Sequence, residues 1–280
     1  MATTRDHTLQ SDIAKMKTEP DGSFKRLDAS FRNTIEKGGR FEPELDRYHL
    51  YVSYACRADV DPVYHSEHVK DLYIKVDPDY SGRFTVPVLW DKKTHTIVNN
   101  ESSEIIRIFN TAFNDAIPAD KAKLHFYPAN LRAQIDELNE WIYPNINNGV
   151  YRAGFATSQA AYQKAVVELF EALDKVEKLL VGKDYLVGDT LTEADIRLWV
   201  TIIRFDPVYV GHFKCNIRTI RDGYPAIHRR VTHPLQIHKL YWNNDAFKSS
   251  TDFDHIKTHY YWSHPAVSAF ATSHLLAIIY

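Results

Sequence analysis

The stretch Phe84-Thr85-Val86-Pro87-Val88-Leu89-Trp90 has the β-branched and aromatic composition of a strand, but a proline interrupts it. Because proline cannot donate a ladder hydrogen bond, this stretch belongs at a sheet edge or at a special backbone site. Asp91-Lys92-Lys93-Thr94 then has the composition of a hairpin turn, and Thr96-Ile97-Val98 predicts the partner strand. Upstream, Tyr48–Ala55 predicts another strand, and Cys56 stands at its C-terminal end. We therefore expect a small sheet in this part of the chain.

Segments before and after the hairpin are candidate helices. Val69–Val76 fits either a short helix or a strand, whereas Ser102–Phe113 has apolar residues at the spacing of a helix. From Pro118 onward the pattern is almost entirely helical, and Leu131–Ile142 and Ser158–Leu180 are amphipathic. The chain thus predicts a small α/β part followed by an all-α part.

A further helix is predicted to begin beside Thr192. Thr192 is a suitable N-cap, and Asp195 three residues later completes an arrangement like a capping box. The acidic side chain also suits the positive end of the helix dipole. The pattern runs towards Phe205, and we expect the helix to end before Pro207.

These patterns divide the chain into three segments. We expect an N-terminal extension over residues 1–45, a small α/β domain over 46–114 and a helical domain over 120–280. The first 40 or so residues lack sustained periodicity, so they are either draped on a domain or partly disordered.

Composition excludes several classes of protein. The 280 residues are 44% hydrophobic and 25% charged, with a formal charge of -2, and no basic excess of the kind that nucleic-acid binders carry is present. No apolar run has the length of a membrane span, and the polar first thirty residues do not form a secretory or transit signal. The two cysteines, Cys56 and Cys215, suit a reduced chain. We expect a cytoplasmic protein that binds neither nucleic acid nor membrane.

Three features of the α/β part would each bind a different group of the same kind of ligand. Cys56 offers a thiol at the C-terminal end of a strand, where α/β folds commonly bind ligands. A cis bond at Val86-Pro87 would turn the backbone of Val86 outward, so that it could pair with an extended peptide. Glu101-Ser102 begins a helix, whose free N–H groups and hydroxyl can hold a carboxylate, while Glu101 can meet an ammonium group. Glutathione has all of these groups, although each feature alone also has an ordinary structural explanation.

Longer runs make the pattern specific. They are Arg47–Cys56, Tyr80–Asp91, Ile97–Glu104, Asn147–Ala156, Thr192–Leu198, Arg204–Tyr209, Asp252–Lys257 and His259–Tyr261. Together these runs resemble the glutathionyl-hydroquinone reductases, the Xi class of glutathione transferases, which are also described as omega-like. The resemblance covers roughly residues 40 to 265.

The resemblance implies a fold and an activity. The fold is a thioredoxin-like N-terminal domain, here incomplete, followed by a helical C-terminal domain, and the chains usually form a homodimer. The activity is the reduction of glutathionyl-hydroquinones. The Cys56 thiolate attacks the glutathione sulfur and expels the hydroquinone, and a second glutathione resolves the mixed disulfide.

The resemblance also implies the binding residues. Val86, with the adjoining Pro87, pairs its backbone with glutathione, and Glu101 and Ser102 hold the γ-glutamyl end. The aromatic part of the substrate is lined by Tyr151, Tyr209 and Tyr260, with Arg204 nearby. Without the resemblance, tyrosines packing between helices explain these positions nearly as well.

The chain departs from the family pattern after Cys56. The family continues with Pro-Trp-Ala, a helix and a second strand, whereas here Arg57–Pro62 follows and the pattern resumes near Val63. A reactive cysteine needs a lowered pKa, which a helix N-terminus supplies, and this replacement is a poor helix. Arg229–His238 reads as an insertion, and the tail after Pro265 also leaves the family pattern. Alternative splicing or a misread gene model would explain these differences.

Two readings of the function therefore stay open, beside a third in which the chain does not fold. In the first the chain is an enzyme that works through Cys56, and in the second it is a catalytically impaired binding or structural protein. We expect no metal, because His255 and His259 share a helix face but no third ligand is evident. Cys215 is predicted to be a passive thiol.

Overall fold

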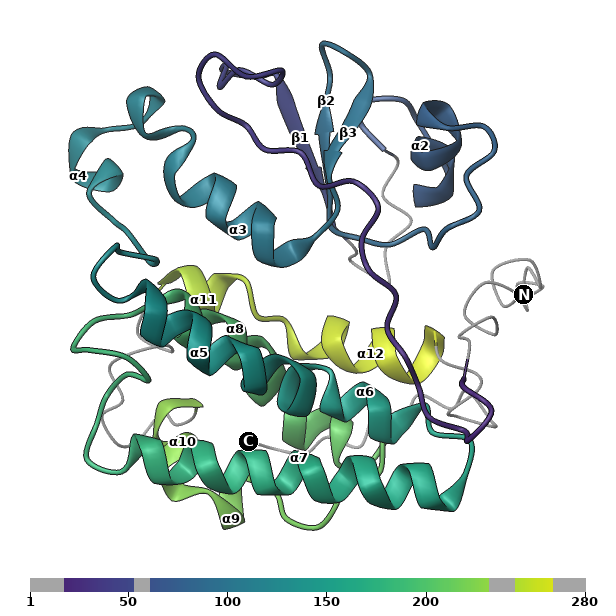
Figure 1. The fold of residues 1–280 in the computed structure, drawn as a ribbon, viewed down its shortest axis with the longest axis vertical. Coiled ribbons are helices and arrows are strands. Elements are labelled where there is room, and N and C mark those ends of the chain that lie inside the picture. Colours follow the sequence, from purple (N-terminus) through teal and green to yellow (C-terminus); the bar gives the residue numbers. More distant parts are fainter. Residues whose placement is uncertain (1–17, 53–60, 232–244, 264–280) are drawn as a thin grey trace. The chain divides into compact units, whose positions relative to one another are not determined.

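A computed structural model describes residues 18–52, 61–231 and 245–263 (Figure 1). Cys56 and most of the predicted insertion and tail lie outside the described residues. The chain divides into two compact units. The α/β unit comprises residues 27–128, and the helical unit combines residues 1–26 with 129–280.

The α/β unit is built on a three-stranded antiparallel sheet in the order β1-β2-β3 (Figure 1). The strands are β1 (Tyr48–Tyr51), β2 (Val88–Asp91) and β3 (Thr96–Asn99), so the predicted hairpin is confirmed. The prediction of a strand from Phe84 was wrong in its start, because β2 begins only after Pro87, which has no N–H to donate. The bond between Val86 and Pro87 is cis.

Two helices cover opposite faces of this sheet. Neighbouring strand residues point to opposite faces, and two separate apolar clusters result. One cluster combines α2 (Val69–Val76) with Val88 and Trp90, and the other combines α3 (Ser102–Thr111) with Leu89. The ambiguous segment Val69–Val76 is therefore a helix, because it packs its apolar side chains on the sheet.

The segment before β1 completes this unit. Its backbone pairs with the end of β3, where Asn33 donates to the Val98 carbonyl and Asn100 donates to the Phe31 carbonyl, each at 3.0 Å. Ile35 and Phe41 are buried in the same cluster as α3. These residues are thus draped on the domain, as one of the two sequence readings expected.

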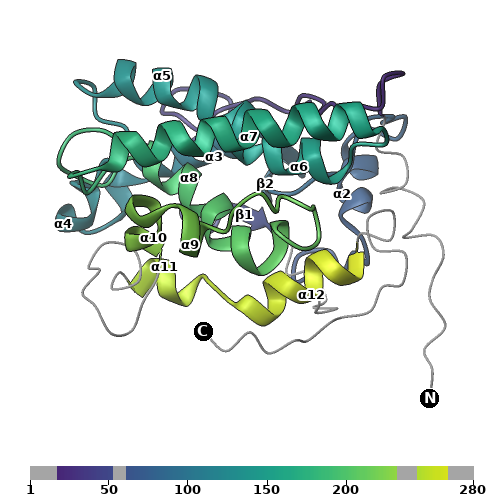
Figure 2. The ribbon, with the colours of Figure 1, turned by 90° about the horizontal axis from the view of Figure 1, so that it is seen from below.

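The helical unit is arranged around one long helix, α7 (Gln159–Leu180), which spans the unit in Figure 2. Its N-cap is Ser158, whose hydroxyl accepts from the Ala161 amide. The predicted amphipathic helices are confirmed, since α7 and α5 (Arg132–Ile142) each bury one face. The remaining helices are α4 (Ala119–Ala122) in the α/β unit and, in the helical unit, α6 (Gly149–Gly154), α8 (Glu193–Arg204), α9 (Ile220–Gly223), α10 (Pro225–Val231), α11 (Asp245–Ser249) and α12 (Phe253–Ser263).

The start of α8 confirms the predicted capping box. The Asp195 carboxylate accepts from the Thr192 amide at 3.0 Å and from its hydroxyl at 2.8 Å, and it also accepts from the Leu186 amide. At its other end α8 stops at Arg204, but a π-helical turn, Phe205–Tyr209, follows directly. The helical path therefore continues past Pro207, although proline lacks the N–H that the interior of a helix uses.

Residues near the N-terminus belong to the helical unit. The Gly22 carbonyl accepts from the Thr157 amide at 2.9 Å, and the Asp21 carbonyl accepts from the Ser158 hydroxyl at 2.8 Å. Phe24 is buried against the ring of Phe155, with 5.5 Å between centroids. In the described part of the chain, no helix is long and apolar enough to cross a bilayer.

Candidate functional site

The start of α3 presents the residues predicted to hold a carboxylate and an amine. Glu101 is the N-cap, and its carboxylate accepts from the amide of Ser103 at 3.1 Å and from its hydroxyl at 2.9 Å. The Glu101 amide is held by the side chain of Asn99 at 2.7 Å. Ser102 is the first residue of the helix, where backbone N–H groups lack intrahelical partners. Glu101 already accepts from the Ser103, Glu104 and Ile105 amides, so the amide and hydroxyl of Ser102 are the groups at this end that could meet a carboxylate.

The other predicted glutathione contact lies in the segment before β2. Thr85, Val86 and Pro87 stand outside the strand ladder, so the Val86 backbone is not used by the β2 pairings. This segment is tied to the start of α3 by the hydroxyl of Tyr73, which donates to the Thr85 carbonyl at 2.7 Å and accepts from the Asn100 side-chain amide at 3.0 Å.

The helical unit brings together the three tyrosines predicted for the aromatic site. The hydroxyl of Tyr260 lies 2.7 Å from that of Tyr151 and 2.9 Å from that of Tyr209. The three come from α6, the π turn Phe205–Tyr209 and α12, so the cluster exists only in the folded chain. A second π turn, Tyr143–Asn147, directly precedes α6. Such turns occur frequently at functional sites because they redirect the side chains that follow.

Burial favours the protonated form of Tyr209 and Tyr260. Tyr209 and Tyr260 are 2% and 5% exposed. Burial, reinforced by the neighbouring phenols, raises the pKa of both well above the usual value, although the charge of Arg204 opposes the shift. Burial, with a smaller contribution from Arg204, lowers the pKa of His259, so this ring favours its neutral form. Tyr209 and Tyr260 are therefore uncharged hydrogen-bonding groups within reach of the charge of Arg204.

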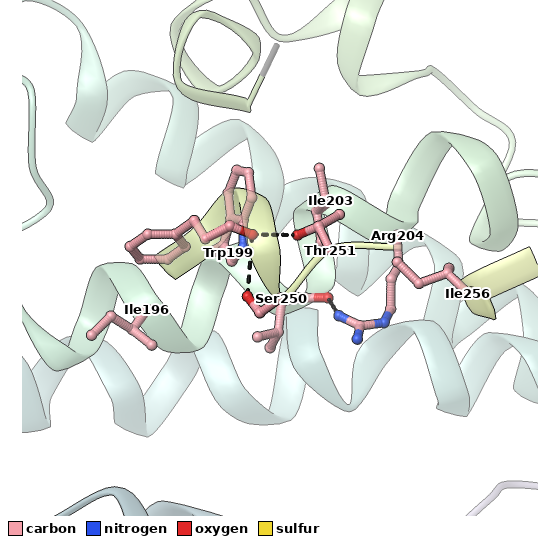
Figure 3. A pocket seen from close by; sticks show the side chains of 9 residues that line it. Ile196, Trp199, Ile203, Arg204, Ser250, Thr251 and Ile256 are labelled. Carbon is pink, nitrogen blue, oxygen red and sulfur yellow. Dashed lines mark hydrogen bonds between the residues drawn. The ribbon is translucent and has the colours of Figure 1, made fainter. Parts of the chain in front are cut away.

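Arg204 also borders a cavity in the helical unit (Figure 3). The cavity has a volume of about 150 Å³ and is lined by both polar and apolar side chains. The Arg204 guanidinium turns back to its own helix and donates to the Val200 carbonyl at 2.5 Å. The lining residues are Ile196, Trp199, Val200, Ile203, Arg204, Phe247, Ser250, Thr251 and Ile256.

The described chain resumes beyond Cys56 in a turn. The Asp61 carboxylate accepts from the amides of Val63, Tyr64 and Ser66 at 2.9 to 3.2 Å, and from the hydroxyl of Tyr51 at 3.1 Å. Burial works against the charge of Asp61, but these donors lower its pKa. The bonds to Asp61 organise a turn and not a helix. Residues 61–68 contain no helix, and α2 begins only at Val69.

Two other predicted positions can be placed. Cys215 is fully buried, and burial raises the pKa of its thiol, so this thiol is a poor nucleophile. His255 and His259 lie in α12. Among the described residues, no group of three histidine, cysteine or acidic side chains could hold a metal ion.

Comparison with known proteins identifies the family. Residues 159–229 match the family model "Glutathione S-transferase, C-terminal domain". The chain is 45% identical to Glutathione S-transferase omega-like 2 of Schizosaccharomyces pombe, an alignment that covers 89% of this chain and 91% of the relative. The crystal structure of the glutathione-S-transferase Xi from Phanerochaete chrysosporium superposes with a TM-score of 0.90 at 56% identity, covering 97% of this chain and 98% of that one. This chain belongs to the Xi-class, omega-like glutathione transferases.

A bacterial member of this class has a more specific name. Glutathionyl-hydroquinone reductase YqjG of Escherichia coli is 43% identical over 88% of this chain and 87% of its own length, and its glutathione-bound structure superposes with a TM-score of 0.79. The resemblance, the fold class and the assignment to an enzyme family are thereby confirmed. The alignments with the S. pombe and E. coli relatives extend over 291 and 295 positions, more than the 280 residues of this chain. Both relatives thus contain residues that have no counterpart here.

Sequence reasoning missed two residues of the α/β unit. Tyr73 lies in the segment whose pattern fits either a helix or a strand, so the sequence does not predict which way its side chain points. Asn100 precedes a predicted helix and resembled an ordinary loop residue. Reading Val69–Val76 as a helix would have placed Leu72 and Tyr73 on its buried face, and this was the available signal.

Proposed function

We propose that this transferase reduces glutathionyl-hydroquinones with glutathione as cosubstrate. The Cys56 thiolate attacks the sulfur of the conjugate and forms a mixed disulfide, while the carbon–sulfur bond breaks and its electron pair goes to the ring carbon, which takes up a proton. A second glutathione thiolate then attacks the mixed disulfide, releasing glutathione disulfide and regenerating Cys56. The conjugate is reduced to the hydroquinone, and two glutathione moieties are oxidised to one disulfide.

Within this proposal the α/β unit binds the glutathione part. Val86, with Pro87, offers a backbone that the strand ladder does not use, and an extended peptide can pair with such a backbone. Ser102 and the α3 N-terminus receive the γ-glutamyl carboxylate, while Glu101 receives its ammonium group. The glutathione-bound relative supports this cosubstrate.

The observation that carries the aromatic half of the proposal is the tyrosine cluster. Tyr209 and Tyr260 stay protonated. The two bonds that join the three hydroxyls use two O–H donors, so one O–H is left to donate to a hydroquinone oxygen. Tyr151 extends the network, and Arg204 adds a positive charge that stabilises a hydroquinone oxyanion.

One observation favours a second candidate, a transferase-like binding protein with impaired catalysis. Asp61 organises a turn in the described segment after Cys56, and residues 61–68 contain no helix whose N-terminus could lower the pKa of a thiol.

Intact-mass analysis separates the two candidates. The chain is incubated with a glutathionyl-hydroquinone, without free glutathione, and the expected product is one glutathionyl adduct per chain together with free hydroquinone. Cys215→Ser should form the same adduct, because its thiol is buried, whereas Cys56→Ser should form none. A folded chain that gains no adduct would favour the binding protein, and an equal adduct on Cys56→Ser would refute the role of Cys56.

The family resemblance also supports a homodimer, which we propose as the assembly. Light scattering during size-exclusion chromatography would give twice the mass of the chain, and a monomer mass at micromolar concentration would contradict it.

A further inference from the structure

Tyr73 occupies a central position in the α/β unit. It lies in α2, its side chain is fully buried, and three other rings surround it. The ring centroids of Phe31, Tyr80 and Phe84 lie 5.9, 5.0 and 5.6 Å from that of Tyr73. These contacts hold the phenol ring in one orientation, so its hydroxyl has a defined place.

The hydroxyl of Tyr73 uses its full hydrogen-bonding capacity. A phenol has one O–H donor and two acceptor lone pairs. The donor binds the Thr85 carbonyl at 2.7 Å, and the oxygen accepts from the Asn100 side-chain amide at 3.0 Å and from the Thr85 amide at 3.3 Å. Thr85 is thus held through both its carbonyl and its amide, which fixes the direction of the backbone that enters Val86.

Asn100 is equally constrained. It is 6% exposed, its amide donates to the Phe31 carbonyl, and its side-chain oxygen accepts from the Phe31 amide, each at 3.0 Å. Its side-chain nitrogen is the group that reaches Tyr73. Since Asn100 directly precedes Glu101, this bond links the Tyr73 hydroxyl to the residue before the N-cap of α3.

We propose that Tyr73 is a positioning residue for glutathione, which sets the spacing between the Val86 backbone and the Glu101–Ser102 helix start. This inference rests on the proposed glutathione site. An extended tripeptide spans the two segments only if their separation matches its length, and one hydroxyl between Thr85 and Asn100 fixes that separation. Preorganised spacing of this kind improves affinity, because the ligand does not have to order the two segments on binding.

The test compares two variants that each remove one hydroxyl from the same aromatic cluster. Tyr73→Phe breaks the link between Thr85 and Asn100. Tyr80→Phe is the control, because its hydroxyl contacts only the Arg83 carbonyl at 3.2 Å and the Ser30 hydroxyl at 3.0 Å among the described hydrogen bonds. Glutathione affinity is measured by titration calorimetry, and circular dichroism confirms that each variant is folded at the temperature used.

We expect Tyr73→Phe to weaken glutathione binding about tenfold, because the ligand must then order the two segments on binding at a cost of roughly 1.4 kcal/mol. Tyr80→Phe should change the affinity less than twofold. A folded Tyr73→Phe variant that binds like the unaltered chain would overturn the positioning role, and so would equal weakening in both variants. If the unaltered chain binds no glutathione, the proposed site itself fails, and this result is distinct from either of the others.

Discussion

The pair formed by Arg47 and Asp91 offers the sharpest test of how this fold is held together. The two lie beside the β1–β2 pairing, where Tyr48 is the partner of Asp91. The Asp91 side chain is fully buried and accepts two hydrogen bonds from the Arg47 guanidinium, at 2.9 and 2.7 Å. It also accepts from the Thr94 hydroxyl at 2.5 Å and from the Lys93 amide at 2.9 Å. Asp91→Asn keeps the shape of the side chain and removes its charge.

The size of the effect follows from the pKa of Asp91. Burial alone would raise this pKa, but the hydrogen bonds from Arg47, Thr94 and the Lys93 amide lower it from 3.8 to about 2. A depression of this size contributes about 2 kcal/mol to the free energy of unfolding at neutral pH. Leaving the Arg47 charge buried without its partner adds to the loss, so we expect Asp91→Asn to cost about 3 kcal/mol.

The contribution has a definite dependence on pH. Because the folded-state pKa is lowered, the stabilisation is fully present above pH 3.8 and is lost as the pH falls towards 2. Urea unfolding, followed by circular dichroism, should therefore show a difference between variant and unaltered chain that is about 1 kcal/mol smaller at pH 3 than at pH 7.

A matched control shows how much of the cost comes from the burial of the Asp91 charge. Glu44 contacts the same guanidinium at 3.0 Å but is 41% exposed, so Glu44→Gln should cost less than about 1 kcal/mol. The double variant Arg47→Met with Asp91→Leu should recover most of the loss, because it leaves neither charge buried alone. A cost below about 1 kcal/mol for Asp91→Asn, or a cost independent of pH, would refute the reasoning.

Three further predictions concern the helical unit. Gly154→Ala should lower stability by about 1–3 kcal/mol in thermal unfolding, because its new Cβ would lie 2.3 Å from the ring of Phe213; an unchanged melting temperature would contradict this packing. Cys215 should react with iodoacetamide only after unfolding, as peptide mass analysis would show, and fast labelling of the folded chain would contradict its burial. Tyr260→Phe should cost about 1–3 kcal/mol in urea unfolding, because it removes a partner of the buried Tyr209 hydroxyl, and a neutral effect would show that this hydroxyl finds another partner.

Local patterns predicted most of the elements. The capping box at Thr192 and Asp195 depends only on neighbours three residues apart, so the sequence is sufficient to locate it. The segment Val69–Val76 was ambiguous because eight residues with mixed spacing do not distinguish a helix from a strand, and only its packing on the sheet decides. The π turn at Phe205–Tyr209 could not be predicted, since Pro207 ordinarily indicates the end of a helix.

The arrangement of the candidate site could not be predicted from local sequence patterns. Tyr151, Tyr209 and Tyr260 were named through a resemblance, and nothing in their spacing indicates that their hydroxyls meet. They stand on three separate elements, and the distances between them depend on how those elements pack. Cys56 lies outside the described residues, so its reactivity remains a prediction to be measured.

The position of Phe24 has a consequence for how the chain can be divided. Residues 18–26 lie in the helical unit, and the chain leaves this unit at residue 27 and returns at residue 129. No single cut therefore releases either unit intact, and a fragment that starts at residue 129 would expose the face of Phe155 that Phe24 covers. During synthesis, residues 18–26 must wait for more than a hundred further residues before Thr157 and Ser158 are available to bind them.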